Sequence, residues 1–227
     1  MKFFGKFEKN NQDKVYRTRT FLCLDGSSQL VEPNQSDIIG TIFMLNPGAS
    51  RPLGSEIDKP FKNYIFNAYT DLEADATMNV FLDTFNRLKN IEKYLNGVIE
   101  IKNLFNYRES NLSSEDWRAV ISDITNNSNT FNINFSPTFE GDFVFFSWGS
   151  SKLKTKEIKE YSKQIFLKSK SEKKKVLYIS PNDIDKSEKL LSFYHPLGGQ
   201  WKSDKRERFN NSLYYIFDKL EPIINFE

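Results

Sequence analysis

The chain has 227 residues, of which 38% are hydrophobic and 27% are charged, and its formal net charge is +2. A chain of this length buries roughly 70% of the surface that it exposes when unfolded, so it needs no disulfide to hold a core. One histidine and one cysteine exclude a structural zinc site of the usual type, and motifs for nucleotide-phosphate and dinucleotide binding are absent. We therefore expect no metal and no cofactor.

The same inventory bears on location. No run approaches the roughly 18 apolar residues of a membrane-spanning helix, and the first residues lack the apolar segment of a signal peptide. The single Cys23 cannot form an internal disulfide, which is typical of a reducing compartment. We expect a cytoplasmic monomer with no membrane contact.

Apolar runs alternate with amphipathic segments along the chain. In order, the pattern predicts a strand at 15–24, a loop at 25–37, a strand at 38–45, a helix at 77–96, a strand at 98–104, a helix capped by Ser113 and Asp116, a loop at 126–137, a strand at 142–148, a helix at 150–168, a strand at 176–180 and a helix at 204–220. Strands that alternate with helices predict a single α/β domain over residues 1–227, in which the N-terminal strand and loop at 1–37 lead into the core. The expected architecture is a three-layer α/β/α sandwich around a mainly parallel sheet.

Charge is distributed unevenly along the chain. Residues 150–208 hold 16 basic against 8 acidic residues, whereas the remainder holds 16 basic and 22 acidic residues. A basic third beside an acidic remainder favours a polyanionic partner such as DNA. The alternative is that the lysines at 152–175 form the solvated face of a helix.

Unusual polar or glycine-containing segments follow four of the predicted strands. They are Asn46-Pro47-Gly48, the segment 102–108 around Asn103, Trp148-Gly149, and the segment 194–201 around His195. Ligands bind to open α/β sheets at the carboxyl ends of the strands, so these segments form the candidate site. Each also has an ordinary structural explanation as a turn, a strand-end hydrogen bond, core packing or a loop.

The order of these segments resembles the uracil-DNA glycosylase superfamily. It is also similar to a family of small bacterial and phage proteins that share an MLNP…NLF…WG…HPL order, and the likeness covers residues 16–220. Asn46-Pro47-Gly48 resembles the water-positioning motif of the mismatch-specific and single-strand-selective branches. His195-Pro196 resembles the start of the superfamily's His-Pro-Ser-Pro loop, although Leu197-Gly198 stand here in place of Ser-Pro.

The resemblance implies a monofunctional DNA glycosylase that hydrolyses the N-glycosidic bond of a flipped pyrimidine and leaves an abasic site. Asn46 and His195 would be catalytic: the Asn46 amide orients a water molecule, and His195 donates a hydrogen bond to the base as negative charge develops there. Asn103 would read the edge of the base with an amide that offers both a donor and an acceptor. Phe61 would stack on the face of the base, although core packing explains this residue equally well.

Gly48 stands where the uracil-specific branch has a tyrosine that blocks groups at the pyrimidine C5 position. The resemblance therefore implies room for a C5 substituent, and a substrate that is either uracil or a C5-modified pyrimidine. Hypermodified cytosine in phage DNA is one candidate, which would make the protein a phage-defence enzyme.

DNA contacts are expected in the basic part of the chain. Lysine and arginine side chains would hold phosphates, and Leu197 or Trp201 would fill the gap left by the flipped base. The residues assigned to DNA binding are Ser150, Leu197, Trp201, Lys202 and Arg206.

Two other functions remain open from the sequence. Because the Asn46 amide cannot accept a full proton, the chain could be a non-catalytic module of the same fold that binds a modified base in DNA. It could also be a hydrolase of free nucleotides or nucleosides, in which case the basic segment is incidental.

Overall fold

The computed structural model describes residues 1–11, 13–26, 30–57, 59–90, 96–109, 112–126, 128, 131–133, 135–148, 155–172, 174–178 and 203–218. The strands are β1 (Lys2–Lys9), β2 (Val15–Cys23), β3 (Ile38–Met44), β4 (Arg51–Pro52), β5 (Tyr69–Glu73), β6 (Val98–Asn103), β7 (Phe143–Ser147) and β8 (Lys175–Tyr178). The helices are α1 (Ala76–Asn90), α2 (Ser114–Asn126), α3 (Lys156–Ser171) and α5 (Ser203–Asp218), with a short 3-10 helix at Gln35–Asp37. Among the described helices, none is both long and apolar enough to cross a membrane.

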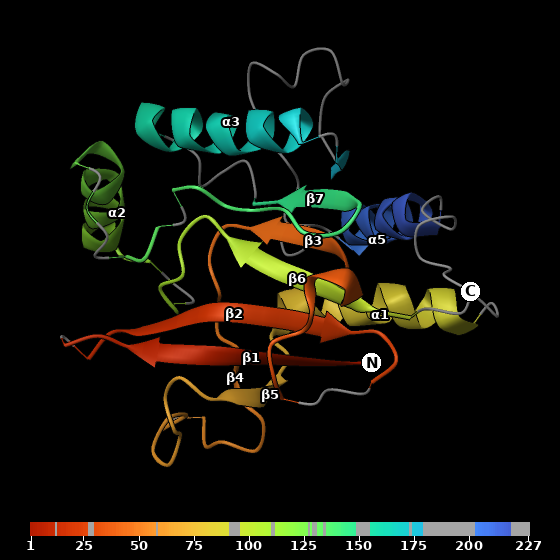
Figure 1. The fold of residues 1–227 in the computed structure, drawn as a ribbon, viewed down its shortest axis with the longest axis horizontal. Helices are drawn as coiled ribbons and strands as arrows, with labels where there is room; N and C mark the ends of the chain where they lie inside the picture. The colour runs from red at the N-terminus through yellow and green to blue at the C-terminus, as the bar shows by residue number, and fades with distance from the viewer. Residues whose placement is uncertain are drawn as a thin grey trace.

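The strands form one mixed sheet in the order β4-β5-β1-β2-β6-β3-β7-β8 (Figure 1). Strands β6, β3, β7 and β8 pair in parallel, whereas the pairs β4–β5, β5–β1, β1–β2 and β2–β6 are antiparallel. The expected α/β class is confirmed. The described strands, however, form a mixed sheet and not the mainly parallel sheet that the sequence predicted. For β1 and β2 the reason is connection length, because they are separated by only five residues and such a link permits antiparallel pairing alone.

Helices cover both faces of this sheet. Phe85 of α1 and Phe217 of α5 lie 4.8 Å apart between ring centroids and belong to one buried cluster. Val120 of α2 and Phe166 of α3 belong to a second cluster on the other side of the sheet. Figure 1 shows α3 beyond β7 and α2 at the left of the strands, with α1 and α5 at the right of the view. We call the two sides the α1/α5 face and the α2/α3 face.

Strand β3 lies at the centre of the parallel half. All seven of its residues are buried, and a strand buried on both faces carries a continuous apolar run, which is why 38–45 was recognisable in the sequence. Parallel pairing places Met44 opposite Asn103 of β6 and opposite Ser147 of β7. We call the ends of β3 and β6, with the loop 46–50 and the segment 104–109 that follow them, the carboxyl edge.

Side-chain caps fix where the helices begin. Asp75 precedes α1, and its Oδ1 accepts hydrogen bonds from the backbone N–H groups of Thr77 and Met78 at 3.0 and 2.9 Å. Helix α3 begins at Lys156, later than the expected start at 150, because Thr155 caps it. The predicted helices at 77–96 and 204–220 correspond to α1 and α5; residues 91–95 and 219–220 lie outside the described residues, and Asn96 is not helical.

The sequence did not predict β1, β4 or β5. Strand β1 lacks a strict alternation of apolar and polar residues, and it is held by pairing with β2 over its whole length and with β5 at three positions. The segment 1–37 therefore contains two paired strands where the sequence predicted one strand and a loop. Pairing with distant strands, rather than local pattern, decides this part of the fold.

We expect Ser113→Ala to destabilise the protein by about 1 kcal/mol. Oγ of Ser113 accepts a hydrogen bond from the Asp116 N–H at 3.0 Å, and Oδ2 of Asp116 accepts one from the Ser113 N–H at 2.9 Å, the reciprocal box that the sequence predicted. Ser114→Ala, at the first residue of α2, is the matched control, and urea unfolding measures both variants. Equal free energies of unfolding would show that the box contributes nothing.

Candidate functional site

Asn46 follows β3 at the carboxyl edge and is half-buried. Its Nδ2 donates a hydrogen bond to the backbone carbonyl of Glu109 at 2.6 Å. A carbonyl can only accept, so this contact fixes the amide with its NH₂ group toward Glu109. Oδ1 of Asn46 has no partner among the described residues, and it is therefore available to accept a hydrogen bond from water.

Gly48 has a φ of +63°, in the left-handed region that favours glycine. A Cβ at this position would also lie 2.7 Å from Oδ2 of Asp75. Both the backbone conformation and the close approach of Asp75 therefore favour glycine at this position. This requirement is independent of any selection among bases, so Gly48 does not by itself indicate room for a C5 substituent.

Arg108 ties the loop 46–50 to the segment that follows β6. Its Nε and Nη2 donate hydrogen bonds to the backbone carbonyls of Ser50 and Ala49 at 2.6 and 2.7 Å. Its guanidinium carbon lies 5.2 Å from the centre of the Phe61 ring, within the range of a cation–π interaction. Arg108 therefore brings together the loop that carries Asn46 and the loop that carries Phe61.

Phe61 itself is partly buried and packs against the core of the α1/α5 face. Its ring lies 4.9 Å from that of Phe7 and 5.7 Å from that of Phe66, measured between centroids. Stacking on a base needs a free ring face, and Arg108 already lies over this ring. These contacts favour the core-packing alternative for Phe61.

Asn103 is the last residue of β6 and is 1% exposed. It lies opposite Met44 in the parallel pairing with β3, and it also lines the polar cavity described below. Its Oδ1 is buried and has no hydrogen-bond partner. A buried polar atom without a partner is costly, so its presence here is consistent with an atom that awaits a ligand or a water molecule.

Arg17 of β2 contacts the same loop from the N-terminal hairpin. Its Nη1 donates a hydrogen bond to Oγ of Ser50 and lies 3.3 Å from Sδ of Met78. Its backbone N–H donates to the carbonyl of Asn106 at 2.9 Å, which joins β2 to the segment after β6. The hairpin that the sequence did not predict thus brings a buried cation to the carboxyl edge.

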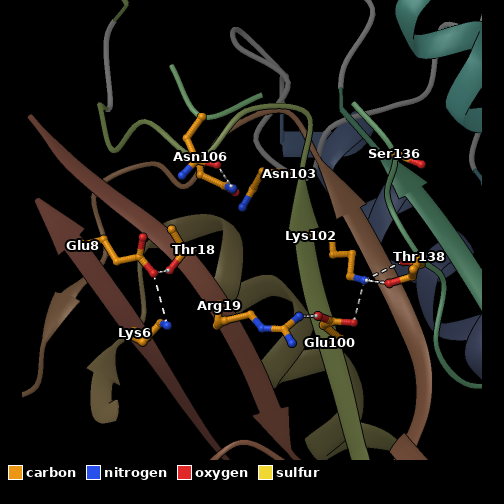
Figure 2. A pocket seen from close by; sticks show the side chains of 11 residues that line it. Lys6, Glu8, Thr18, Arg19, Glu100, Lys102, Asn103, Asn106, Ser136 and Thr138 are labelled. Atoms are coloured by element: carbon orange, nitrogen blue, oxygen red, sulfur yellow. Dashed lines mark hydrogen bonds and ion pairs between the residues drawn. The ribbon is translucent and has the colours of Figure 1, made fainter. Parts of the chain in front are cut away.

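A polar cavity of about 400 Å³ lies against β1, β2 and β6, on the α2/α3 face (Figure 2). It is lined by Lys6, Glu8, Thr18, Arg19, Glu100, Lys102, Asn103, Asn106, Asn132, Ser136 and Thr138. Figure 2 shows a chain of contacts across its floor from Arg19 through Glu100 to Lys102. The Glu100 carboxylate accepts from Nη1 of Arg19 at 2.9 Å and lies 3.1 Å from Nζ of Lys102.

The charges of this cavity are paired with one another. Arg19 and Lys102 share Glu100, and Lys6 pairs with Glu8 at 3.1 Å. Burial raises the pKa of Glu100, and the nearby Lys102 and Arg19 oppose that rise. Each lining cation therefore has a carboxylate partner, so the cavity suits water or a neutral polar molecule better than a phosphate.

Part of the predicted site cannot be placed. His195, Ser150, Leu197, Trp201 and Lys202 lie outside the described residues, and Arg206 lies in α5 with its side chain outside them. Asn46, Gly48, Phe61 and Asn103 are placed, and all four lie at or beside the carboxyl edge. Within the described part of the chain, no cluster of three or more histidine, cysteine, aspartate or glutamate side chains could hold a metal ion.

Sequence reasoning did not assign Arg17, Asp75 or Arg108 to the site. A signal for Arg17 was present, because it is a charged residue inside a predicted strand. Arg108 lies in a segment that was singled out, but its partner Ser50 is 58 residues away in the chain. No local pattern encodes a contact of that separation.

No family model matches the sequence, and searches of curated proteins and of solved structures find no match either. The function must therefore be argued from the residues and their geometry.

We expect Gly48→Ala to destabilise the protein more than Gly54→Ala. Both glycines have a left-handed φ, +63° and +74°, so alanine strains the backbone by about 1–2 kcal/mol at either position. A Cβ at Gly54 meets nothing within 4 Å, whereas a Cβ at Gly48 meets Asp75. Urea unfolding of the two variants measures the difference, and similar losses would contradict the close approach of Asp75.

We expect Glu100→Gln to gain stability relative to the wild-type protein as the pH rises. A carboxyl group whose pKa is raised by folding stabilises the folded state at low pH, and this contribution is lost as the pH rises through the raised pKa. The glutamine variant lacks this loss, which amounts to about 1.4 kcal/mol for each unit of pKa difference. Urea unfolding between about pH 5 and 8, with the exposed Glu115→Gln as control, measures it. The raised pKa of Glu100 would be refuted if the free energy of unfolding of Glu100→Gln, relative to that of the wild-type protein, stayed constant or fell as the pH rose.

Proposed function

We propose that the protein is a DNA glycosylase with a fold of the uracil-DNA glycosylase type, which removes uracil or a C5-modified pyrimidine from DNA and leaves an abasic site. The observation that carries the proposal is the orientation of Asn46. Its Nδ2 is held by the Glu109 carbonyl at 2.6 Å, which leaves Oδ1 to accept a hydrogen bond from water. Hydrolysis of an N-glycosidic bond needs a water molecule held in position beside the anomeric carbon.

The neighbouring strand end supports the same proposal. Asn103 ends β6, directly opposite Met44, two residues before Asn46. The buried Oδ1 of Asn103 has no hydrogen-bond partner within the described ranges, so it can accept a hydrogen bond from the edge of a base. Uracil offers an N–H donor at N3 and cytosine offers one at N4, and both fit an acceptor at this place.

In the proposed reaction the bond between C1′ of the deoxyribose and the pyrimidine nitrogen breaks, and the base leaves with the electron pair. Water adds to C1′, and its proton passes to solvent or to the departing base. Asn46 orients the water but does not take the proton, because an amide is not a base. His195 is assigned the hydrogen bond that stabilises negative charge on the base.

The identity of the base does not follow from Gly48, since the left-handed backbone conformation already favours glycine there. The test therefore uses a panel of DNA oligonucleotides that carry uracil, cytosine, hydroxymethylcytosine or glucosylated hydroxymethylcytosine, without added metal. Abasic sites are detected by alkaline cleavage of the DNA. We expect product from at least one of these bases.

We expect Asn46→Ala to lower the rate of product formation at least about 100-fold, because the water loses its positioning group, while DNA affinity changes little. Asn126→Ala, an exposed asparagine at the end of α2, is the matched control. An unchanged rate in Asn46→Ala would overturn the role of Asn46.

Wild-type protein that cleaves no member of the panel but binds DNA with strong salt dependence would favour the non-catalytic base-binding module. Cleavage of free nucleotides alone would favour the nucleotide hydrolase.

A further inference from the structure

Arg17 is a fully buried arginine that has no ion pair with any residue that the structure describes. Burying a guanidinium costs free energy that a carboxylate normally offsets, so such residues are rare. Arg17 is 1% exposed, and it forms no ion pair with any carboxylate in the described part of the chain. Burial lowers its pKa to about 10, which still leaves the guanidinium charged at neutral pH.

The hydrogen bonds of Arg17 occupy one end of its guanidinium group. Nη1 donates to Ser50 and contacts Met78, whereas Nε and Nη2 are buried and have no hydrogen-bond partner among the residues that the structure places. Nε and Nη2 direct two N–H groups in parallel along one side of the planar group. This side-on edge is the one that binds carboxylates and phosphates through two hydrogen bonds.

The charged groups around Arg17 in the described part of the chain accept no hydrogen bond from its Nε or Nη2. Asp75 favours the charged form of Arg17, but its Oδ1 accepts from the backbone of α1, and no hydrogen bond joins it to Arg17. Arg108 lies close enough to oppose the charge of Arg17. A second guanidinium beside the loop, that of the half-buried Arg51, pairs with Glu73 at 2.7 Å through Nη2, while its buried Nε has no partner in the described part of the chain.

Three arginines thus meet around the loop 46–50, and they come from separate parts of the chain. Arg17 belongs to β2, Arg51 begins β4, and Arg108 follows β6. The polar cavity on the α2/α3 face differs in this respect, because each of its lining cations already has a carboxylate partner. Buried donors of Arg17 and Arg51 that have no partner among the described residues therefore lie beside the carboxyl edge, where the candidate site lies.

We propose that the Nε–Nη2 edge of Arg17 binds a phosphate group at the carboxyl edge. The proposal rests on the proposed function, in which the phosphate belongs to the DNA backbone beside the flipped nucleotide. A free nucleotide supplies the same chemistry from a second source. A phosphate presents two oxygen atoms side by side, so it satisfies both donors and neutralises the buried positive charge. A base or a sugar supplies no charge and would leave the guanidinium without a counter-ion.

The experiment compares the wild-type protein with Arg17→Met, Arg17→Lys and Arg118→Met, the last an exposed arginine of α2 that serves as the matched control. The probes are an oligonucleotide with a tetrahydrofuran abasic-site analogue, deoxyuridine monophosphate, and deoxyuridine as the uncharged control. Affinity is measured as a function of salt concentration, and Tm is recorded for every variant.

We expect Arg17→Met to bind a phosphate probe about tenfold more weakly or worse, and to lower the salt dependence of oligonucleotide binding by about one phosphate contact. Deoxyuridine binding stays the same. The Tm of Arg17→Met does not fall below that of the wild-type protein, because the variant no longer buries a charge without a counter-ion. Arg17→Lys keeps the charge but loses the two parallel donors, so it recovers only part of the affinity. Arg118→Met behaves as wild type.

Equal affinity of the wild-type protein and Arg17→Met for both phosphate probes overturns the proposal. A lower Tm of Arg17→Met combined with full affinity in Arg17→Lys also overturns it, because those results identify a structural arginine. Arg17-dependent binding supports the proposal, and the probe that shows it distinguishes DNA from a free nucleotide. The abasic analogue is not a substrate, so its binding does not depend on cleavage. If the protein binds it through Arg17 but cleaves no base, the phosphate site is supported and the proposed glycosylase function is wrong.

Discussion

The parallel pairing of β3 with β6 on one side and β7 on the other is the constraint on which the candidate site depends. β3 is buried along all seven of its residues, so a shift in its register would move apolar side chains out of the core. The observed register sets Met44 opposite Asn103. A hydrogen bond of 3.0 Å from the Leu104 N–H to the Met44 carbonyl continues the pairing past the end of β6. Both segments of the carboxyl edge therefore leave the sheet from fixed positions.

Polar contacts, more than apolar packing, hold the loop that follows β3. Arg108 binds two consecutive carbonyl groups of the loop, and Glu109 anchors the Asn46 side chain through its own carbonyl. Gly48 supplies a left-handed turn that lets the loop approach Asp75, the residue that caps α1. The orientation of the Asn46 amide is consequently tied to both the start of α1 and the segment after β6. A loop fixed in this way keeps a hydrogen-bond acceptor in one place, which is the property that positioning of water requires.

Buried charged side chains are paired differently on the two faces of the antiparallel half of the sheet. On the α2/α3 face, Glu100 lies between Arg19 and Lys102, so the charges compensate one another within the protein. On the side that contacts α1, Arg17 is buried with two unused donors and no ion pair among the described residues. Compensated charge is an ordinary feature of a folded protein, whereas an uncompensated buried charge lowers stability. The second arrangement is the observation from which we propose a phosphate site at Arg17.

The sequence by itself determined the features that depend on local pattern. The apolar runs identified β3, β6 and β7, and the spacing of Ser113 and Asp116 identified the start of α2. Because strand ends can be read from such runs, the sequence also placed Asn46 and Asn103 at the ends of buried strands. Only the tertiary structure decided the antiparallel half of the sheet, the burial of Arg17 and the packing of Arg108 over the Phe61 ring. These features depend on groups that are distant in the chain, and hydrogen bonding between distant segments leaves no periodic signal in the sequence.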